Sequence, residues 1–168
     1  MANYKGHVVG GLLAGTVVSA GYYLLPGRGM PNSAVLVGDW QLLVAVYVVA
    51  VLFGLWPDVD TNSKAQDIFF GIAFAADVLL IAFGYFAAAA ILGLLAMTPI
   101  VGTHRGWTHS RLAMIIVPLP IVIVSYLASS QVGETSLLIY GAAVAGYFSH
   151  LLFDGLIIKS FRIKGAWK

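Results

Sequence analysis

The residues best suited to chemistry in this sequence are histidines, aspartates and arginines beside long apolar runs. The stretch GTHRGWTHSR, residues 102–111, holds His104 and His109, two of the four histidines, together with Arg105 and Arg111. Imidazoles bind divalent metals or transfer protons, and guanidinium groups match the oxygens of phosphate. An ordinary basic loop at a membrane surface is the alternative, but it explains the arginines and not the paired histidines.

The second motif is SHLLFD, residues 149–154. His150 and Asp154 are four residues apart, so on a helix they lie one turn apart on the same face. An imidazole and a carboxylate so placed can grip one divalent metal. The alternative is a His–Asp hydrogen bond that ties two helices together. Because ionisable groups inside a membrane are costly, we favour the functional interpretation.

Two weaker signals complete the set. Asp58 and Asp60 follow Pro57, which we expect to end a helix. In an extended stretch both carboxylates would face one cation, whereas in a turn Asp60 would cap the next helix. His7 heads the first apolar run and by itself would be an interfacial residue. Within 107–111, we expect Thr108 to be the N-cap of a helix that starts near His109.

The composition defines the elements that must position these groups. The chain is 60% hydrophobic and 10% charged, with a mean hydropathy of +0.92. We therefore predict an all-α, polytopic transmembrane bundle, a single integral membrane domain spanning residues 1–168, whose partners are membrane lipids. Without cysteine there is no disulfide and no thiolate ligand. The net charge of +2 is too small to indicate a nucleic-acid partner, and the oligomeric state is left open.

The apolar runs predict about five to six membrane segments. The run 68–97 would be about 45 Å long as one helix, so we expect a short or re-entrant hairpin there. Gly11 and Gly15 have the spacing that lets helices pack closely. Pro118 and Pro120 are expected to kink the fourth run.

Charge and the placement of the motifs together favour the hairpin; charge alone barely disfavours a single crossing, which would divide the Lys and Arg residues seven to two. With a hairpin, the four motif regions share one face, and Arg28 is the only Lys or Arg on the other face. Cytoplasmic loops favour Lys and Arg, so this face is predicted to be cytoplasmic. A single crossing would place Asp58 and His109 on opposite sides. The basic C-terminal residues are expected at an anionic membrane surface; they are Lys159, Arg162, Lys164 and Lys168.

The pattern resembles the YdjM-like (LexA-regulated) inner-membrane metal-dependent hydrolases. The matching elements are HVVGG at 7–11, PDVD at 57–60, HRGWTHS at 104–110 and SHLLFD at 149–154. The resemblance implies a cytoplasmic membrane of a bacterium or archaeon. It also implies a metal and catalytic set consisting of His7, Asp58, Asp60, His104, His109, His150 and Asp154.

Together these features predict a hydrolase at the cytoplasmic interface that uses zinc or manganese on a lipid or phosphoester. We expect His150, Asp154 and Asp60 to anchor the metal, with His109 or His7 completing the ligand set. His104 would handle protons and Arg105 would neutralise developing negative charge. A two-metal version fits equally well.

Two other functions remain open from the sequence. A metal-ion or proton transporter or channel would also place His and Asp inside the membrane, and Asp77 would then lie on its route. A non-enzymatic scaffold would use His–Asp pairs only to lock helices. A conduit threads polar groups from side to side, whereas an enzyme gathers them at one face.

Overall fold

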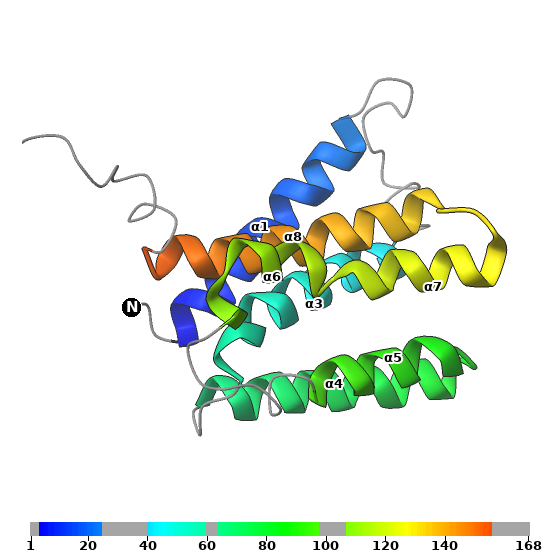
Figure 1. Cartoon of the computed structure of the whole chain (residues 1–168), viewed down its shortest axis with the longest axis horizontal. Coiled ribbons are helices and arrows are strands. Elements are labelled where there is room, and N and C mark those ends of the chain that lie inside the picture. Colours follow the sequence, from blue (N-terminus) through cyan, green and yellow to red (C-terminus); the bar gives the residue numbers. More distant parts are fainter. Residues whose placement is uncertain (1–3, 25–39, 60–63, 98–106, 156–168) are drawn as a thin grey trace, which may run out of the picture.

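The computed structural model describes residues 4–24, 40–59, 64–97 and 107–155. All regular structure in these ranges is helical, which confirms the predicted all-α class. Figure 1 shows the helices as one bundle with the first turn of the chain at its left end.

Three long helices form the centre of the bundle: α1 (Tyr4–Leu24), α3 (Trp40–Leu55) and α8 (Glu134–Phe153). Each of the three packs against the other two, and α1 is inclined to both partners (Figure 1). The hydrophobic core near the C-terminal end of α3 contains Trp56 and Tyr147, whose exposed fractions are 1% and 0%. Among the described residues, three segments are long and apolar enough to cross a membrane: Tyr4–Leu24, Trp40–Asp58 and Glu134–Phe153.

Glycines allow these three helices to approach closely. A Cβ on Gly11 of α1 would lie 2.7 Å from the Cα of Val51 in α3. A Cβ on Gly146 of α8 would overlap the backbone carbonyl of Ala50, the residue before Val51 in α3. The packing role predicted for Gly11 is therefore confirmed, and the close contact sets how the ends of the helices meet.

The run 68–97 is a hairpin, as predicted. It contains α4 (Lys64–Ala82) and α5 (Phe86–Met97), which pack on each other along one side of the bundle in Figure 1. Gly84, with φ of 80°, makes the turn between them, because L side chains disfavour that conformation. The Trp56 indole donates to the carbonyl of Leu95 at 3.2 Å and ties the hairpin to the bundle.

The fourth apolar run was predicted to be kinked at Pro118 and Pro120, and the structure interrupts it at Pro118. α6 (Arg111–Ile116) ends before Pro118, and α7 (Leu119–Ser129) continues from it toward the turn into α8. Pro118 lies at the start of α7, where its missing N–H costs no intrahelical bond. α7 packs on α8, and the two helices lie side by side in Figure 1.

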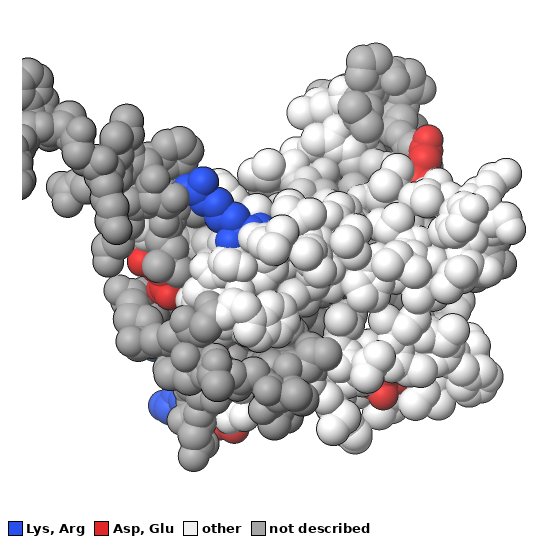
Figure 2. Space-filling model, viewed as in Figure 1, with Lys and Arg blue, Asp and Glu red and all other residues white. Residues whose placement is uncertain are grey.

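The surface of the described residues suits a membrane. Large apolar side chains are exposed along several helices, for example Val17 at 71% and Leu127 at 75%. In Figure 2, most of the visible surface is uncharged, and charged side chains gather toward the left end, with isolated red atoms elsewhere. Besides the three spans, Phe86–Met97 and Arg111–Leu127 are apolar but shorter. The predicted count of five to six membrane segments therefore stays a prediction.

Candidate metal centre

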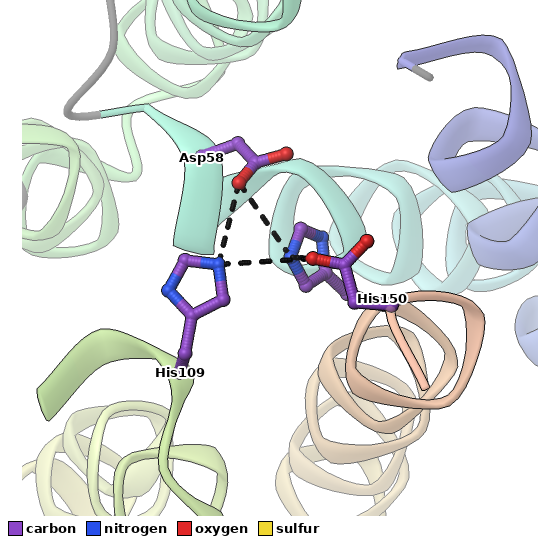
Figure 3. Close-up of side chains that lie close together, drawn as sticks. Asp58, His109 and His150 are labelled. Atoms are coloured by element: carbon purple, nitrogen blue, oxygen red, sulfur yellow. Dashed lines mark ion pairs between the residues drawn. The ribbon is translucent and has the colours of Figure 1, made fainter. Parts of the chain in front are cut away.

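Four side chains from separate parts of the sequence meet at one end of the bundle. Asp58, His109, His150 and Asp154 each offer one ligand atom, and these atoms all lie within 4.8 Å of one another. Figure 3 shows Asp58, His109 and His150 pointing toward a common centre. The hairpin places Asp58 and His109 together, with 3.4 Å between Oδ1 and Nε2. The prediction that these two motifs share a face is confirmed.

The two α8 residues face each other as their spacing predicts. Nε2 of His150 lies 3.6 Å from Oδ2 of Asp154, and 3.7 Å from Oδ1 of Asp58. The same Oδ2 of Asp154 also lies 4.0 Å from Nε2 of His109. Asp154 follows the last residue of α8, and Gly155 ends the helix with φ of 70°. The end of α8 thus brings one carboxylate to two imidazoles.

A backbone carbonyl selects the ligand nitrogen of His150. The Nδ1 of His150 lies 2.9 Å from the carbonyl oxygen of Gly54, which can only accept a hydrogen bond. Nδ1 therefore carries the proton, and in the neutral ring Nε2 keeps its lone pair toward the cluster. Gly54 supplies one of the last four carbonyls of α3, which have no partner within the helix. Such outer hydrogen bonds orient histidine ligands in metal sites.

Asp58 is positioned by a short 3₁₀ turn, η1 (Trp56–Asp58), that continues directly from α3. Pro57 lies at the start of this turn, so the chain tightens instead of extending. Of the two alternatives that the sequence left open at Asp58, an extended stretch and a turn, the structure therefore has the turn. The side chain of Asp58 is 24% exposed, more than the 10% of His109, so Asp58 is the side of the cluster nearer to solvent.

His109 is held by η3 (Trp107–His109), the turn before α6. Thr108 is 1% exposed, and its hydroxyl lies 3.1 Å from Nδ1 of His109. The N-cap of α6 is Ser110, whose hydroxyl accepts from the N–H of Ala113 at 3.0 Å. The N-cap predicted at Thr108 is therefore wrong. Both residues are good caps, and the extra turn frees the Thr108 side chain to contact the imidazole.

Tyr147 of α8 supports this turn, although no motif in the sequence had pointed to it. Its hydroxyl donates to the carbonyl of Thr108, and its ring packs near Trp56. Tyr147 lies three residues before His150 and seven before Asp154, so a helix puts all three on one face. That spacing, together with the need of a buried tyrosine hydroxyl for a partner, is the signal that could have found it.

His7 joins the cluster from α1. It is 1% exposed, and its ring stacks on that of His150 with centroids 4.0 Å apart. Nε2 of His7 lies 3.7 Å from Asp58 and 3.6 Å from Asp154. The topology therefore does bring His7 to the motif face, as predicted. A Cβ on Gly54 would lie 3.2 Å from the carbonyl oxygen of His7, so the glycine permits this close approach.

Among the described residues, the histidine nitrogens that face the cluster have no hydrogen-bond partner. The buried nitrogens without a partner are Nε2 of His109, Nε2 of His150 and both nitrogens of His7. Leaving a buried polar atom unpaired costs about 1–3 kcal/mol. The separations of 3.4–4.0 Å from the carboxylates are too long for good hydrogen bonds. They resemble the spacing of about 3.4 Å between ligands on one tetrahedral metal. The residues present thus fit a divalent cation.

The remaining predicted residues are distributed as follows. Asp60, His104 and Arg105 lie outside the described residues. Arg111 is described and exposed at the first position of α6. In the described part of the chain, Lys5, Lys64 and Arg111 are the only Lys or Arg, and each is the first or second residue of its helix.

The fold and the cluster define a helical membrane protein with a buried group of histidines and aspartates at one end of its bundle. Residues 1–163 match the family model of the YdjM inner membrane protein. The chain therefore belongs to the YdjM inner membrane protein family. This match confirms the predicted family, and together with the apolar helices it supports the predicted location in a membrane. Comparison with curated proteins and with solved structures gives no match.

Proposed function

We propose that this protein is a membrane-embedded, metal-dependent hydrolase that acts at the cytoplasmic interface on a lipid or another phosphoester. The observation that carries the proposal is the cluster of four ligand atoms within 4.8 Å, in which Nε2 of His109 and Nε2 of His150 are buried and have no hydrogen-bond partner among the described residues. A helix-locking role would instead pair these nitrogens, because an unpaired buried polar group weakens the fold.

The donor set favours zinc or manganese. Two imidazoles and two carboxylates, without thiolate, suit a divalent ion of intermediate hardness. Asp58, His109, His150 and Asp154 would hold it. Such an ion supplies Lewis acidity at the scissile bond and a nucleophile at neutral pH.

The protein's own side chains supply the positioning. His150 is fixed by Gly54, and the His109 turn is fixed by Tyr147 and Thr108, so both imidazoles keep their orientation without the ion. The core around Trp56 excludes water below the cluster. Outside the described residues, His104 is proposed to transfer protons and Arg105 to neutralise negative charge on the substrate.

The substrate class follows from location and charge. The described Lys and Arg residues lie at the cluster end, where a positive-inside arrangement places the cytoplasm. Lipid headgroups lie at the same depth as these side chains. A phosphoester at this depth would reach the cluster from the side of Asp58, its most exposed member.

A metal-ion or proton conduit is the alternative that one observation favours. Asp77 lies within α4, far along the helix from the cluster end, and its Oδ1 is buried with no hydrogen-bond partner within the described ranges. A conduit predicts that Asp77→Asn abolishes uptake of Mn²⁺ into proteoliposomes. The hydrolase predicts that the wild-type protein gives no such uptake.

The proposed function is tested with full-length protein purified in detergent. Metal content is measured by plasma mass spectrometry after incubation with Zn²⁺ or Mn²⁺ and removal of free ions. The test variant is His150→Ala/Asp154→Ala, and the control is Asp67→Ala, which removes a carboxylate from the first turn of α4. Hydrolysis of p-nitrophenyl phosphate and of phosphatidic acid in mixed micelles is then measured.

We expect bound metal and phosphoester hydrolysis in the wild type and in Asp67→Ala, and loss of both in the double variant. A wild-type protein that takes up neither ion overturns the metal centre. A metal-loaded protein that hydrolyses neither ester overturns the proposed activity on phosphoesters.

A further inference from the structure

His7 is the buried polar residue that a single metal position leaves without a role. Its side chain is 1% exposed, and neither ring nitrogen has a hydrogen-bond partner in the part of the chain that the structure describes. It lies in the first turns of α1, a different helix from the residues of the four-ligand cluster. Packing alone would be served better by an apolar side chain, so the two buried nitrogens indicate a ligand.

The two carboxylates divide their oxygens between two directions. Oδ1 of Asp58 faces His109 at 3.4 Å, whereas Oδ2 of Asp58 faces His7 at 3.7 Å. Asp154 repeats the pattern: Oδ2 faces His150 at 3.6 Å, and Oδ1 faces His7 at 3.6 Å. Each carboxylate therefore spans from the His109 and His150 side to the His7 side.

The ring geometry separates these two sides. The rings of His7 and His150 are stacked, with an interplanar angle of 21° and centroids 4.0 Å apart. An imidazole nitrogen donates its lone pair in the plane of its ring, over a bond of about 2.1 Å to the metal. Two nearly parallel rings at this spacing direct their lone pairs to neighbouring positions instead of to one ion.

We infer that the site holds two divalent ions, bridged by Asp58 and Asp154, with His109 and His150 on one ion and His7 on the other. The ring spacing of 4.0 Å agrees with the separation of about 3.5–4 Å between ions in two-metal hydrolytic sites. The two carboxylates offset only half of the four positive charges.

The net positive charge of a two-ion site narrows the class of substrate to anions. This inference about the substrate rests on the proposed function. A site with two ions and two described carboxylates attracts an anion, and paired ions stabilise both the attacking and the leaving oxygen at phosphorus. An anionic phosphomonoester, in a lipid headgroup or free in solution, is therefore the favoured substrate over a neutral ester. Phosphatidic acid and p-nitrophenyl phosphate distinguish the two sources.

The inference is tested by titrating the full-length, metal-depleted protein with Mn²⁺. Bound Mn²⁺ per chain is counted by equilibrium dialysis, and electron paramagnetic resonance detects whether the ions are magnetically coupled. The test variant His7→Phe keeps a stacked ring at this position but removes both nitrogens. The control Ser19→Ala changes another buried polar residue of α1 outside the four-ligand cluster.

We expect two coupled Mn²⁺ ions per chain in the wild type and in Ser19→Ala, and one uncoupled ion in His7→Phe. One uncoupled ion in the wild type overturns the inference, and this result does not depend on the folding of any variant. Two coupled ions in a folded His7→Phe protein overturn the role of His7. Two ions without hydrolysis would contradict the proposed function only, whereas one ion with hydrolysis contradicts this inference only.

Discussion

His150 and Gly54, 96 residues apart in the chain, are joined by a hydrogen bond of 2.9 Å from the imidazole Nδ1 to the backbone carbonyl oxygen. The bond links the last turns of α8 and α3, so helix packing and ligand orientation depend on one contact. It also sets which nitrogen can bind a metal, because the protonated Nδ1 leaves Nε2 with the lone pair. The cluster is thus oriented by the fold itself.

Tyr147 is predicted to be a positioning residue for His109. Tyr147→Phe removes the donor to the carbonyl of Thr108 and should weaken Mn²⁺ or Zn²⁺ binding about 10–100-fold, the usual effect of losing an outer-shell partner. Isothermal titration calorimetry measures the affinity. A purely structural role predicts a lower melting temperature with an unchanged affinity.

Tyr140 offers the matched control for this change. Its hydroxyl also donates to a backbone carbonyl of α6, that of Ile115 at 3.1 Å. This hydrogen bond is exposed, and Tyr140 lies two helical turns before Tyr147 in α8. Tyr140→Phe should leave the metal affinity unchanged. An equal loss of affinity in both variants would refute the specific role of Tyr147.

Gly146 is predicted to control the distance between α3 and α8. Gly146→Ala places a Cβ against the backbone of Ala50, where no side chain can move aside, so the helices must separate. We expect a loss of about 1–3 kcal/mol in the free energy of unfolding, and a lower metal affinity because the Gly54 contact of His150 is strained. Thermal unfolding in detergent and metal titration measure the two effects.

The control for Gly146 is Gly141→Ala in the same helix. A Cβ on Gly141 meets nothing within 4 Å, and alanine favours helix by up to about 1 kcal/mol over glycine. Gly141→Ala should be neutral or stabilising. Destabilisation of similar size in both variants would mean that backbone flexibility, and not close packing, explains the glycines.

Local spacing predicted part of the site correctly. His150 and Asp154 face one another because a helix brings residues four apart together, and that relation needs no tertiary information. The meeting of Asp58 and His109 followed from the hairpin, which charge and length favoured. The first relation depends only on helix geometry, and the second depends on two helices instead of one in the run 68–97.

The supporting contacts were beyond the reach of the sequence. The acceptor for His150 and the partner of Tyr147 are backbone carbonyls, and every residue carries one, so no residue type marks them. After Pro57 the sequence left an extended stretch and a turn open, because proline suits both, and the structure has a 3₁₀ turn. Ser110 and Thr108 are both good N-caps, and residue type alone does not show that Ser110 caps α6 while the carbonyl of Thr108 accepts from Tyr147.

Metal is predicted to stabilise the folded protein. An ion that binds only the folded state adds about 2.7 kcal/mol to the free energy of unfolding when its free concentration is 100 times its dissociation constant. Addition of Mn²⁺ or Zn²⁺ should therefore raise the melting temperature, and a chelator should reverse the rise. Asp154→Asn, which removes a charged ligand without changing size, should abolish the shift, whereas Asp67→Asn should retain it. An equal shift in both variants would place the bound ion elsewhere.

The orientation of the bundle can be tested directly because the chain contains no cysteine. Single cysteines at Lys64, the first residue of α4, at Tyr85 in the α4–α5 turn and at Gln131 in the α7–α8 turn report the two ends of the helices. The hairpin puts Tyr85 and Gln131 at the end opposite Lys64, and the positive-inside rule puts Lys64 in the cytoplasm.

A membrane-impermeant maleimide added to intact cells should label Tyr85→Cys and Gln131→Cys, and it should label Lys64→Cys only after the membrane is opened. Labelling of Lys64→Cys in intact cells would reverse the orientation and place the metal centre away from the cytoplasm. Labelling of Gln131→Cys without Tyr85→Cys would instead show that the α4–α5 hairpin does not reach the far surface and is re-entrant.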